Sequence, residues 1–209
     1  MFAPLPSELL ETFYRIRPQI QERLLSFKHV PFHQYFYELC FCICTPMTKA
    51  QNALIVQKKL MDLNFKENEI DLHKIIRSNS HYIRFHNKKI LYLLEMKRNF
   101  SVIEEILRSI DNVIQLREQL SKTVQGLSFK ESSHFLRNIG KEGIAIIDRH
   151  TFRNLLQLGV IDDETPYPTS KNAYLRIEKQ WNEFAQFVNI SVEEMDFLFF
   201  YNQTKTILK

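Results

Sequence analysis

The stretch Gly126-Leu127-Ser128-Phe129-Lys130 lies between two amphipathic segments and determines how they connect. Residues Asp111 to Thr123 have helical periodicity, Val124 to Phe129 have the composition of a tight hairpin, and Lys130 to Asn138 have the pattern of a second helix. The stretch therefore predicts a helix-hairpin-helix. Such a hairpin presents main-chain N–H groups of a helix N-terminus, which bind phosphate without reading sequence. The alternative is an ordinary turn between two helices with one glycine.

A lysine and an aspartate follow this hairpin at positions where they can act together. Lys130 starts the second helix, and Asp148 comes eighteen residues later in Ile144-Ala145-Ile146-Ile147-Asp148-Arg149-His150. An amine attacks an electrophilic sugar carbon as the free base, which partial burial and a helix N-terminus both favour. A carboxylate stabilises the positive charge that grows when a glycosidic bond breaks. The pair predicts removal of a nucleobase from DNA.

Each of these two residues also has a plainer interpretation. Lys130 on its own is a solvated lysine at the start of a helix. Asp148 on its own is the N-cap of the helix that follows it. Capping N–H groups keep a carboxylate ionised, so the capping role and the catalytic role of Asp148 are compatible.

Composition favours an all-α protein. The chain has 209 residues, 44% of them hydrophobic, with only four glycines and seven prolines, which argues against a turn-rich all-β fold. The net charge of +4 permits a polyanionic partner but does not establish one. We expect a single domain of residues 1–209 with two helical lobes and a cleft between them. The predicted helix-hairpin-helix lobe covers about residues 100–160, and both chain ends form the other lobe.

Three cysteines lie close together at Cys40, Cys42 and Cys44. No second cysteine or histidine pair has the spacing of a zinc site, so core packing is the favoured role. The odd number of cysteines and the lack of a signal peptide fit a reducing compartment, and no apolar run is long enough to cross a membrane. We expect a protein of the cytoplasm or nucleoid.

The central motif resembles a known family. Gly126-Leu127-Ser128-Phe129-Lys130-Glu131-Ser132-Ser133-His134-Phe135-Leu136-Arg137-Asn138-Ile139-Gly140 and the segment ending in Asp148-Arg149-His150 are similar to the type 2 8-oxoguanine DNA glycosylase/AP lyases of the helix-hairpin-helix GPD superfamily. Glu38-Leu39-Cys40-Phe41-Cys42 and Lys205-Thr206-Ile207-Leu208-Lys209 match that family as well.

The resemblance implies a mechanism and a substrate. Lys130 becomes the Schiff-base nucleophile and Asp148 the essential carboxylate, and β-elimination then cleaves the abasic strand. The implied substrate is 8-oxoguanine in duplex DNA, acted on by a monomer that needs no cofactor. Family hairpins often hold a monovalent cation through main-chain oxygens, and the matching positions are the carbonyls of Lys122, Val124 and Leu127.

Base recognition is implied at three positions. Phe85 and Phe200 match the aromatic residues that stack on the extruded purine, and Lys209 matches a terminal lysine that contacts it. The alternative is that the two rings belong to the core and that Lys209 is frayed and solvated.

DNA contacts are expected around the hairpin and the following helix, and two positions depart from the family. Ser128 replaces the second hairpin glycine, so a residue with a Cβ must adopt a backbone that glycine reaches freely. Met47 stands where relatives carry asparagine and can act as an apolar wedge. The remaining expected DNA contacts are Gly126, Arg149 and His150, although His150 is equally compatible with a buried core histidine.

Two other functions remain open. The first is a glycosylase with the same mechanism that acts on another damaged base. The second is a non-catalytic helix-hairpin-helix module that binds DNA for a partner, against which the presence of both Lys130 and Asp148 argues, because phosphate binding requires neither.

Overall fold

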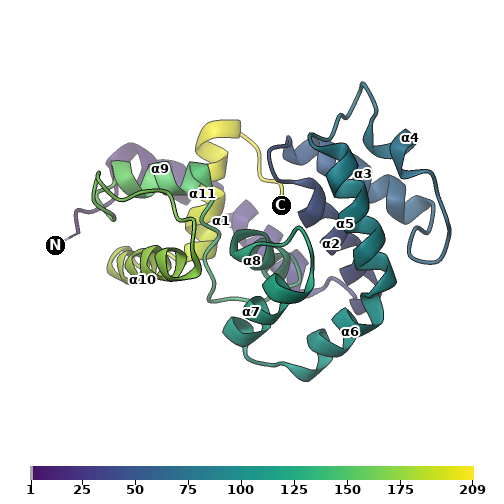
Figure 1. Cartoon of the computed structure of the whole chain (residues 1–209). Helices are drawn as coiled ribbons and strands as arrows, with labels where there is room; N and C mark the ends of the chain where they lie inside the picture. Colours follow the sequence, from purple (N-terminus) through teal and green to yellow (C-terminus); the bar gives the residue numbers. More distant parts are fainter. Residues whose placement is uncertain (1) are drawn as a thin grey trace. The chain divides into compact units, whose positions relative to one another are not determined.

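The protein is all-α, as its composition predicts. The computed structural model describes residues 2–209, and these residues form eleven α-helices and one short 3-10 helix with no strand (Figure 1). None of the helices in this range is long and apolar enough to cross a membrane. In chain order the elements are α1 (Ser7–Lys28), η1 (Phe32–Gln34), α2 (Tyr35–Cys44), α3 (Ala50–Asp62), α4 (Leu72–Ile76), α5 (His86–Arg98), α6 (Phe100–Ser109), α7 (Val113–Thr123), α8 (Phe129–Asn138), α9 (Arg149–Gln157), α10 (Lys171–Val188) and α11 (Val192–Thr204).

The helices belong to two compact units. The hairpin unit contains His29–Ile139 together with Leu208 and Lys209, and the chain-end unit contains the residues up to Lys28 together with Gly140–Ile207. The helix-hairpin-helix lies in the first of these units. The lobe of about residues 100–160 that the sequence indicated spans the boundary between Ile139 and Gly140.

In the hairpin unit, α2 is the central helix. It packs against α3, α5 and α8, and its residues Phe36–Cys44 are all buried. An apolar helix that is buried all round is typical of a core element. Cys40, Cys42 and Cys44 are buried free thiols in this helix, which confirms the packing role. Within residues 2–209 no group of three or more His, Cys, Asp or Glu side chains is arranged to hold a metal ion.

In the chain-end unit, α11 packs against α1, α9 and α10. Its Phe199 stacks on Trp181 of α10 with the ring centroids 6.1 Å apart. Gly140 enters this unit beside the end of α1, where an added Cβ would lie 2.6 Å from the Cα of Lys28. Only glycine fits this close approach, and its φ of +78° also favours glycine.

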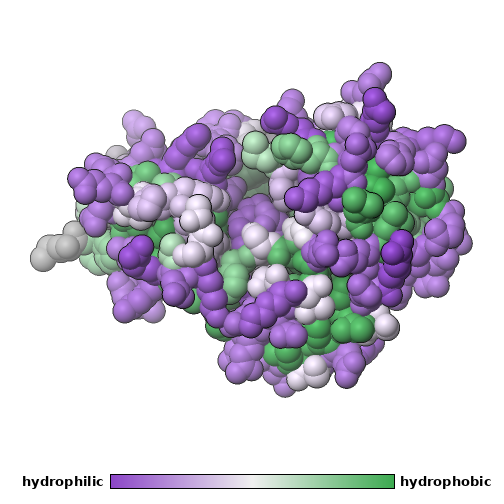
Figure 2. All heavy atoms as spheres, viewed as in Figure 1, coloured by the Kyte–Doolittle hydropathy of each residue, from purple (hydrophilic) through white to green (hydrophobic). Residues whose placement is uncertain are grey.

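Hydrophilic residues cover most of the face seen in Figure 2, with apolar residues visible between them. In the hairpin unit the exposed apolar side chains include Ile55 and Met61 of α3 and Leu91 of α5. Single exposed apolar residues of this kind are normal on a protein surface.

Candidate active site

The predicted helix-hairpin-helix is present as α7, a turn and α8. Leu127 N–H donates to the carbonyl of Val124 at 3.1 Å, which closes the turn. Gly126 has φ +90°, and a Cβ there would lie 2.5 Å from the ring of Tyr92 in α5. This residue therefore needs both the backbone freedom and the small size of glycine.

The first helix of the motif starts two residues later than predicted. The side chain of Asn112 accepts hydrogen bonds from the N–H groups of Ile114 and Gln115, both at 3.0 Å, and α7 begins at Val113. Asp111 lies outside the helix because asparagine is a strong N-cap.

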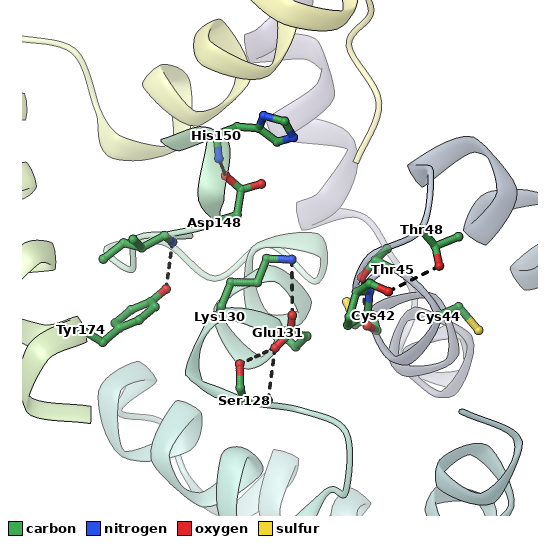
Figure 3. A network of polar contacts seen from close by, with 12 residues as sticks. Cys42, Cys44, Thr45, Thr48, Ser128, Lys130, Glu131, Asp148, His150 and Tyr174 are labelled. Atoms are coloured by element: carbon green, nitrogen blue, oxygen red, sulfur yellow. Dashed lines mark hydrogen bonds and ion pairs between the residues drawn. The ribbon is translucent and has the colours of Figure 1, made fainter. Parts of the chain in front are cut away.

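Ser128 caps α8 and does not have a glycine-like backbone. Its φ is −80° and its ψ is −176°, an extended conformation that any residue adopts. The expectation of strain at this position is therefore wrong. Ser128 N–H donates to Glu131 Oε2 at 3.3 Å, and the hydroxyl donates to the same carboxylate (Figure 3). This is a capping box, which fixes the start of α8.

Lys130 is held at the N-terminal end of α8 by its surroundings. Its side chain is 19% exposed, and Nζ lies 3.4 Å from Glu131 Oε1. The guanidinium of Arg117, a fully buried residue of α7, lies 5.0 Å from the ring centroid of Phe129 and donates to Ser133 Oγ at 3.3 Å. These contacts fix α8 against α7. Lys130 is thus a largely buried amine at a helix N-terminus, and the interpretation as a solvated lysine does not hold.

Asp148 caps α9 in the chain-end unit. Its Oδ1 accepts from the N–H group of His150 at 2.8 Å (Figure 3). The same oxygen accepts from Thr151 N–H at 2.8 Å. The capping role predicted from the sequence is confirmed. Because the carboxylate bonds to main-chain donors, its position is fixed by the backbone.

The segment before Asp148 is fixed by side chains of α10. The hydroxyl of Tyr174 accepts from Ile147 N–H at 3.0 Å and donates to the carbonyl of Ala145 at 2.8 Å. Glu178 accepts from Ala145 N–H at 2.8 Å. These bonds hold a buried, irregular segment whose backbone groups have no helix or sheet partners.

The two residues assigned to DNA from the start of α9 are both exposed. Arg149 and His150 are solvent-accessible at the first turn of the helix. His150 is therefore not a buried core histidine, and its side chain is available to a ligand.

Phe85 and Met47 are exposed apolar residues with unusual backbones. Phe85 is 61% exposed and precedes α5 with φ +57°, and Met47 is 51% exposed with φ +58°. Large side chains rarely adopt a left-handed conformation. The core alternative is wrong for Phe85. Phe200 is half-buried on α11 of the chain-end unit.

Lys209 is anchored in the hairpin unit. Its Nζ donates to Glu38 Oε1 at 2.5 Å and to Gln57 Oε1 at 2.9 Å. Glu38 is only 4% exposed and also accepts from Gln57 Nε2 at 2.8 Å and from Asn138 Nδ2 at 3.3 Å. A buried carboxylate with three donors needs a cationic partner. Lys209 supplies it, so the interpretation as a frayed terminal lysine is wrong.

Comparison with known proteins identifies the family of the chain. Residues 20–190 match the 8-oxoguanine DNA glycosylase family Ogg-HhH. The chain belongs to this glycosylase family. Two 8-oxoguanine DNA glycosylase/AP lyases are among its relatives, one from Fusobacterium nucleatum at 34% identity over 97% of both chains and one from Methanocaldococcus jannaschii at 36% identity over 93% of this chain and 91% of the relative.

Solved structures of the glycosylase family have the same fold. The Thermotoga maritima 8-oxoguanine DNA glycosylase superposes with a TM-score of 0.85 at 27% identity, over 97% of each chain. The Methanocaldococcus jannaschii enzyme in complex with a 15-mer DNA containing 8-oxoguanine superposes with a TM-score of 0.84 at 32% identity, over 97% of this chain and all of that chain.

Several residues around the glycosylase motif were not found by sequence analysis. The Ser-x-x-Glu spacing of Ser128 and Glu131 is a capping signal that would have identified Glu131. His134 had no such signal. It is buried next to the ring of Phe41, and burial together with the nearby Arg137 lowers its pKa well below the usual value.

Proposed function

We propose that this glycosylase excises 8-oxoguanine from duplex DNA with Lys130 as nucleophile and then cleaves the abasic strand. The observation that carries the proposal is the match to 8-oxoguanine DNA glycosylase/AP lyases over nearly the whole chain. In this chain, Lys130 is a largely buried amine at the start of α8, as a lysine nucleophile requires. A non-catalytic DNA-binding module would need neither this amine nor Asp148.

The chemistry assigns one step to each residue. The Lys130 amine forms a bond to C1′ as the bond to the base breaks, while Asp148 stabilises the positive charge on the sugar. The nitrogen then loses a proton to the departing base, and the C1′–O4′ bond breaks as the sugar ring opens, which gives an imine at C1′ and a hydroxyl at C4′. This imine acidifies the C2′ protons. Loss of one of them expels the 3′ phosphate by β-elimination, and hydrolysis of the imine then regenerates the lysine.

Recognition of the base is assigned to three side chains. Phe85 and Phe200 would stack on the extruded purine, and Lys209 would contact it. The exposure of Phe85 and the anchoring of Lys209 support these roles. Met47, Arg149, His150, Gly126 and Ser128 would contact the DNA, with Met47 inserted as a wedge.

The proposal also covers the cofactors, the oligomeric state and the location of the enzyme. The chemistry uses no metal or organic cofactor. The carbonyls of Lys122, Val124 and Leu127 lie in the last turn of α7 and the hairpin, where main-chain oxygens suit a monovalent cation that steadies the turn. The enzyme would act as a monomer on DNA, in the cytoplasm or nucleoid and away from membranes.

A panel of duplexes tests the proposed function. Each duplex carries one defined lesion, either 8-oxoguanine, another oxidised purine, an oxidised pyrimidine or an abasic site, and an undamaged duplex serves as the control. We expect base release from the 8-oxoguanine duplex and strand cleavage at the abasic site. Release of another base in preference to 8-oxoguanine would instead favour the related activity on a different lesion.

A further inference from the structure

Lys89 is a buried lysine of α5 that the proposed chemistry does not use. It is 4% exposed, and its ammonium donates three hydrogen bonds. The acceptors are the carbonyl of Cys44 at 2.7 Å, the carbonyl of Pro46 at 2.7 Å and Thr48 Oγ1 at 3.1 Å. All three N–H donors of the ammonium are therefore satisfied by one short segment between α2 and α3.

That segment carries Met47. Thr48 N–H donates to the carbonyl of Thr45 at 2.9 Å, and Met47 lies within this turn with φ +58°. A left-handed methionine persists only where the surrounding structure holds it. Lys89 binds the residues on either side of Met47 and so supplies that support.

The same lysine is joined to Phe85. Lys89 N–H donates to the carbonyl of Phe85 at 3.1 Å in the first turn of α5. Arg84 N–H, next to Phe85, donates to Thr48 Oγ1 at 3.2 Å. Thr48 therefore accepts from both Lys89 and Arg84 and connects the two segments. The ammonium of Lys89 thus binds the turn that carries Met47 directly, and it is connected to the segment that carries Phe85 through Thr48 and Arg84.

We propose that Lys89 is a positioning residue that fixes Met47 and Phe85 relative to each other, so that the wedge and the stacking ring approach a damaged duplex as one preformed unit. This inference rests on the proposed function, which gives both side chains their contacts with DNA. Orientation of this kind lowers the entropic cost of reaching the reactive geometry. Lys89 itself does not touch the substrate.

The charge of Lys89 makes the anchor sensitive to pH. Burial lowers its pKa to about 8, and the titratable groups that act on it are Cys44 of α2 together with Glu131 and Lys130 of α8. Burial raises the pKa of Cys44 to about 12, so this thiol stays neutral where Lys89 titrates. A neutral amine has only two N–H donors for the three acceptors, and the anchor weakens as pH rises through about 8.

The free energy of global unfolding changes with pH in the opposite direction to the strength of this anchor. The unfolded lysine keeps its proton up to about pH 10.5, whereas the folded one loses it near 8, so the unfolded state binds more protons in between. The contribution of Lys89 to the free energy of unfolding therefore rises with pH in this window. A loss of excision there cannot come from unfolding caused by Lys89.

Paired single-turnover assays test the proposal. Base excision from an 8-oxoguanine duplex and cleavage of a preformed abasic duplex are measured for the parent protein, Lys89→Met, Thr48→Val and the exposed-lysine control Lys74→Met. We expect Lys89→Met to lose roughly 10- to 100-fold in excision, the range for a misplaced group, and much less in abasic cleavage, which needs no base stacking. Thr48→Val should show a smaller loss of the same kind, and Lys74→Met none.

The pH profile separates positioning from a structural role. Between pH 7 and 9 the ratio of excision to abasic cleavage should fall in the parent protein and stay flatter in Lys89→Met. A change at the Lys130 amine affects both substrates alike, and a change in the oxidised base affects all variants alike, so neither produces this difference. Equal losses on both substrates, parental rates in Lys89→Met, or identical pH profiles would each overturn the proposal.

Hydrogen exchange provides a readout independent of activity. Exchange in peptides covering residues 44–48 and 82–86 should accelerate together in Lys89→Met while the rest of the hairpin unit stays protected. Unchanged exchange in both peptides would also overturn the coupling. A parent protein without any excision would instead refute the proposed function, and the exchange data would still decide whether Lys89 joins the two segments.

Discussion

At the scale of single residues, Asp148 combines two roles that one substitution separates. Asparagine is an equally good N-cap, so Asp148→Asn should leave thermal stability nearly unchanged. Loss of the negative charge opposite the developing sugar cation should slow excision roughly 100-fold or more. A thermal melt and a single-turnover rate measure the two effects. A parental excision rate would leave Asp148 with the capping role alone.

Lys209 gives a second prediction at this scale. Lys209→Met leaves Glu38 buried without its cation, and Glu38→Gln removes the ion pair from the other side. Both variants should reduce excision of 8-oxoguanine roughly 10-fold, as expected for a displaced recognition residue, and reduce abasic cleavage far less. The matched control is Lys205→Met, which removes an exposed lysine. Full excision by both variants would exclude the tail from base recognition.

Residues differ in how far sequence predicts their roles. The capping role of Asp148 could be predicted because an aspartate directly before a helical pattern is a local N-cap signal. Glu38, Gln57 and Lys209 could not be connected in this way, since Glu38 and Lys209 are 171 residues apart and meet only in the folded chain. The role of Lys89 could not be predicted either. Lys88 and Lys89 are adjacent lysines, and the folded structure distinguishes them because Lys89 is buried and Lys88 is exposed.

At the scale of elements, the hairpin depends on Gly126. An alanine there combines a positive φ with a Cβ placed 2.5 Å from Tyr92, whereas Gly143 has a similar φ of +82° and nothing within 4 Å of its Cβ. Both substitutions cost roughly 1–2 kcal/mol of backbone strain. Gly126→Ala should destabilise the protein by more than Gly143→Ala in urea unfolding. Equal losses would show that the ring of Tyr92 moves aside freely.

Local signals predict the elements themselves, whereas contacts between residues far apart in sequence decide where one compact unit ends and the other begins. Helical periodicity and the Gly126 hairpin predict α7 and α8 to within two residues, because these signals are local. The boundary between the compact units lies at Ile139 and Gly140 inside the motif that carries Lys130 and Asp148. No composition shift or linker marks it, since Gly140 is selected by its contact with Lys28 far away in sequence.

At the scale of the whole molecule, His134 makes stability depend on pH. Its folded pKa is well below the usual value, whereas an unfolded histidine titrates near 6.5. Below that pH the unfolded state binds a proton that the folded state does not, so stability should fall by about 1.4 kcal/mol per pH unit as pH decreases.

Urea unfolding between pH 7 and 5.5 measures this dependence. His134→Gln should flatten it, and the exposed control His73→Gln should not. The same slope in the parent protein and in His134→Gln would show that other groups produce the acid sensitivity.

The most direct test of the proposed function is covalent trapping of the imine with borohydride on an 8-oxoguanine duplex, followed by mass mapping of the modified peptide. The parent protein and the exposed control Lys179→Gln should both trap, with the adduct on Lys130. Lys130→Gln should bind the lesion duplex but form no adduct and release no base. Full trapping by Lys130→Gln, or an adduct that maps to another amine in the parent protein, would contradict the assignment of Lys130 as the nucleophile.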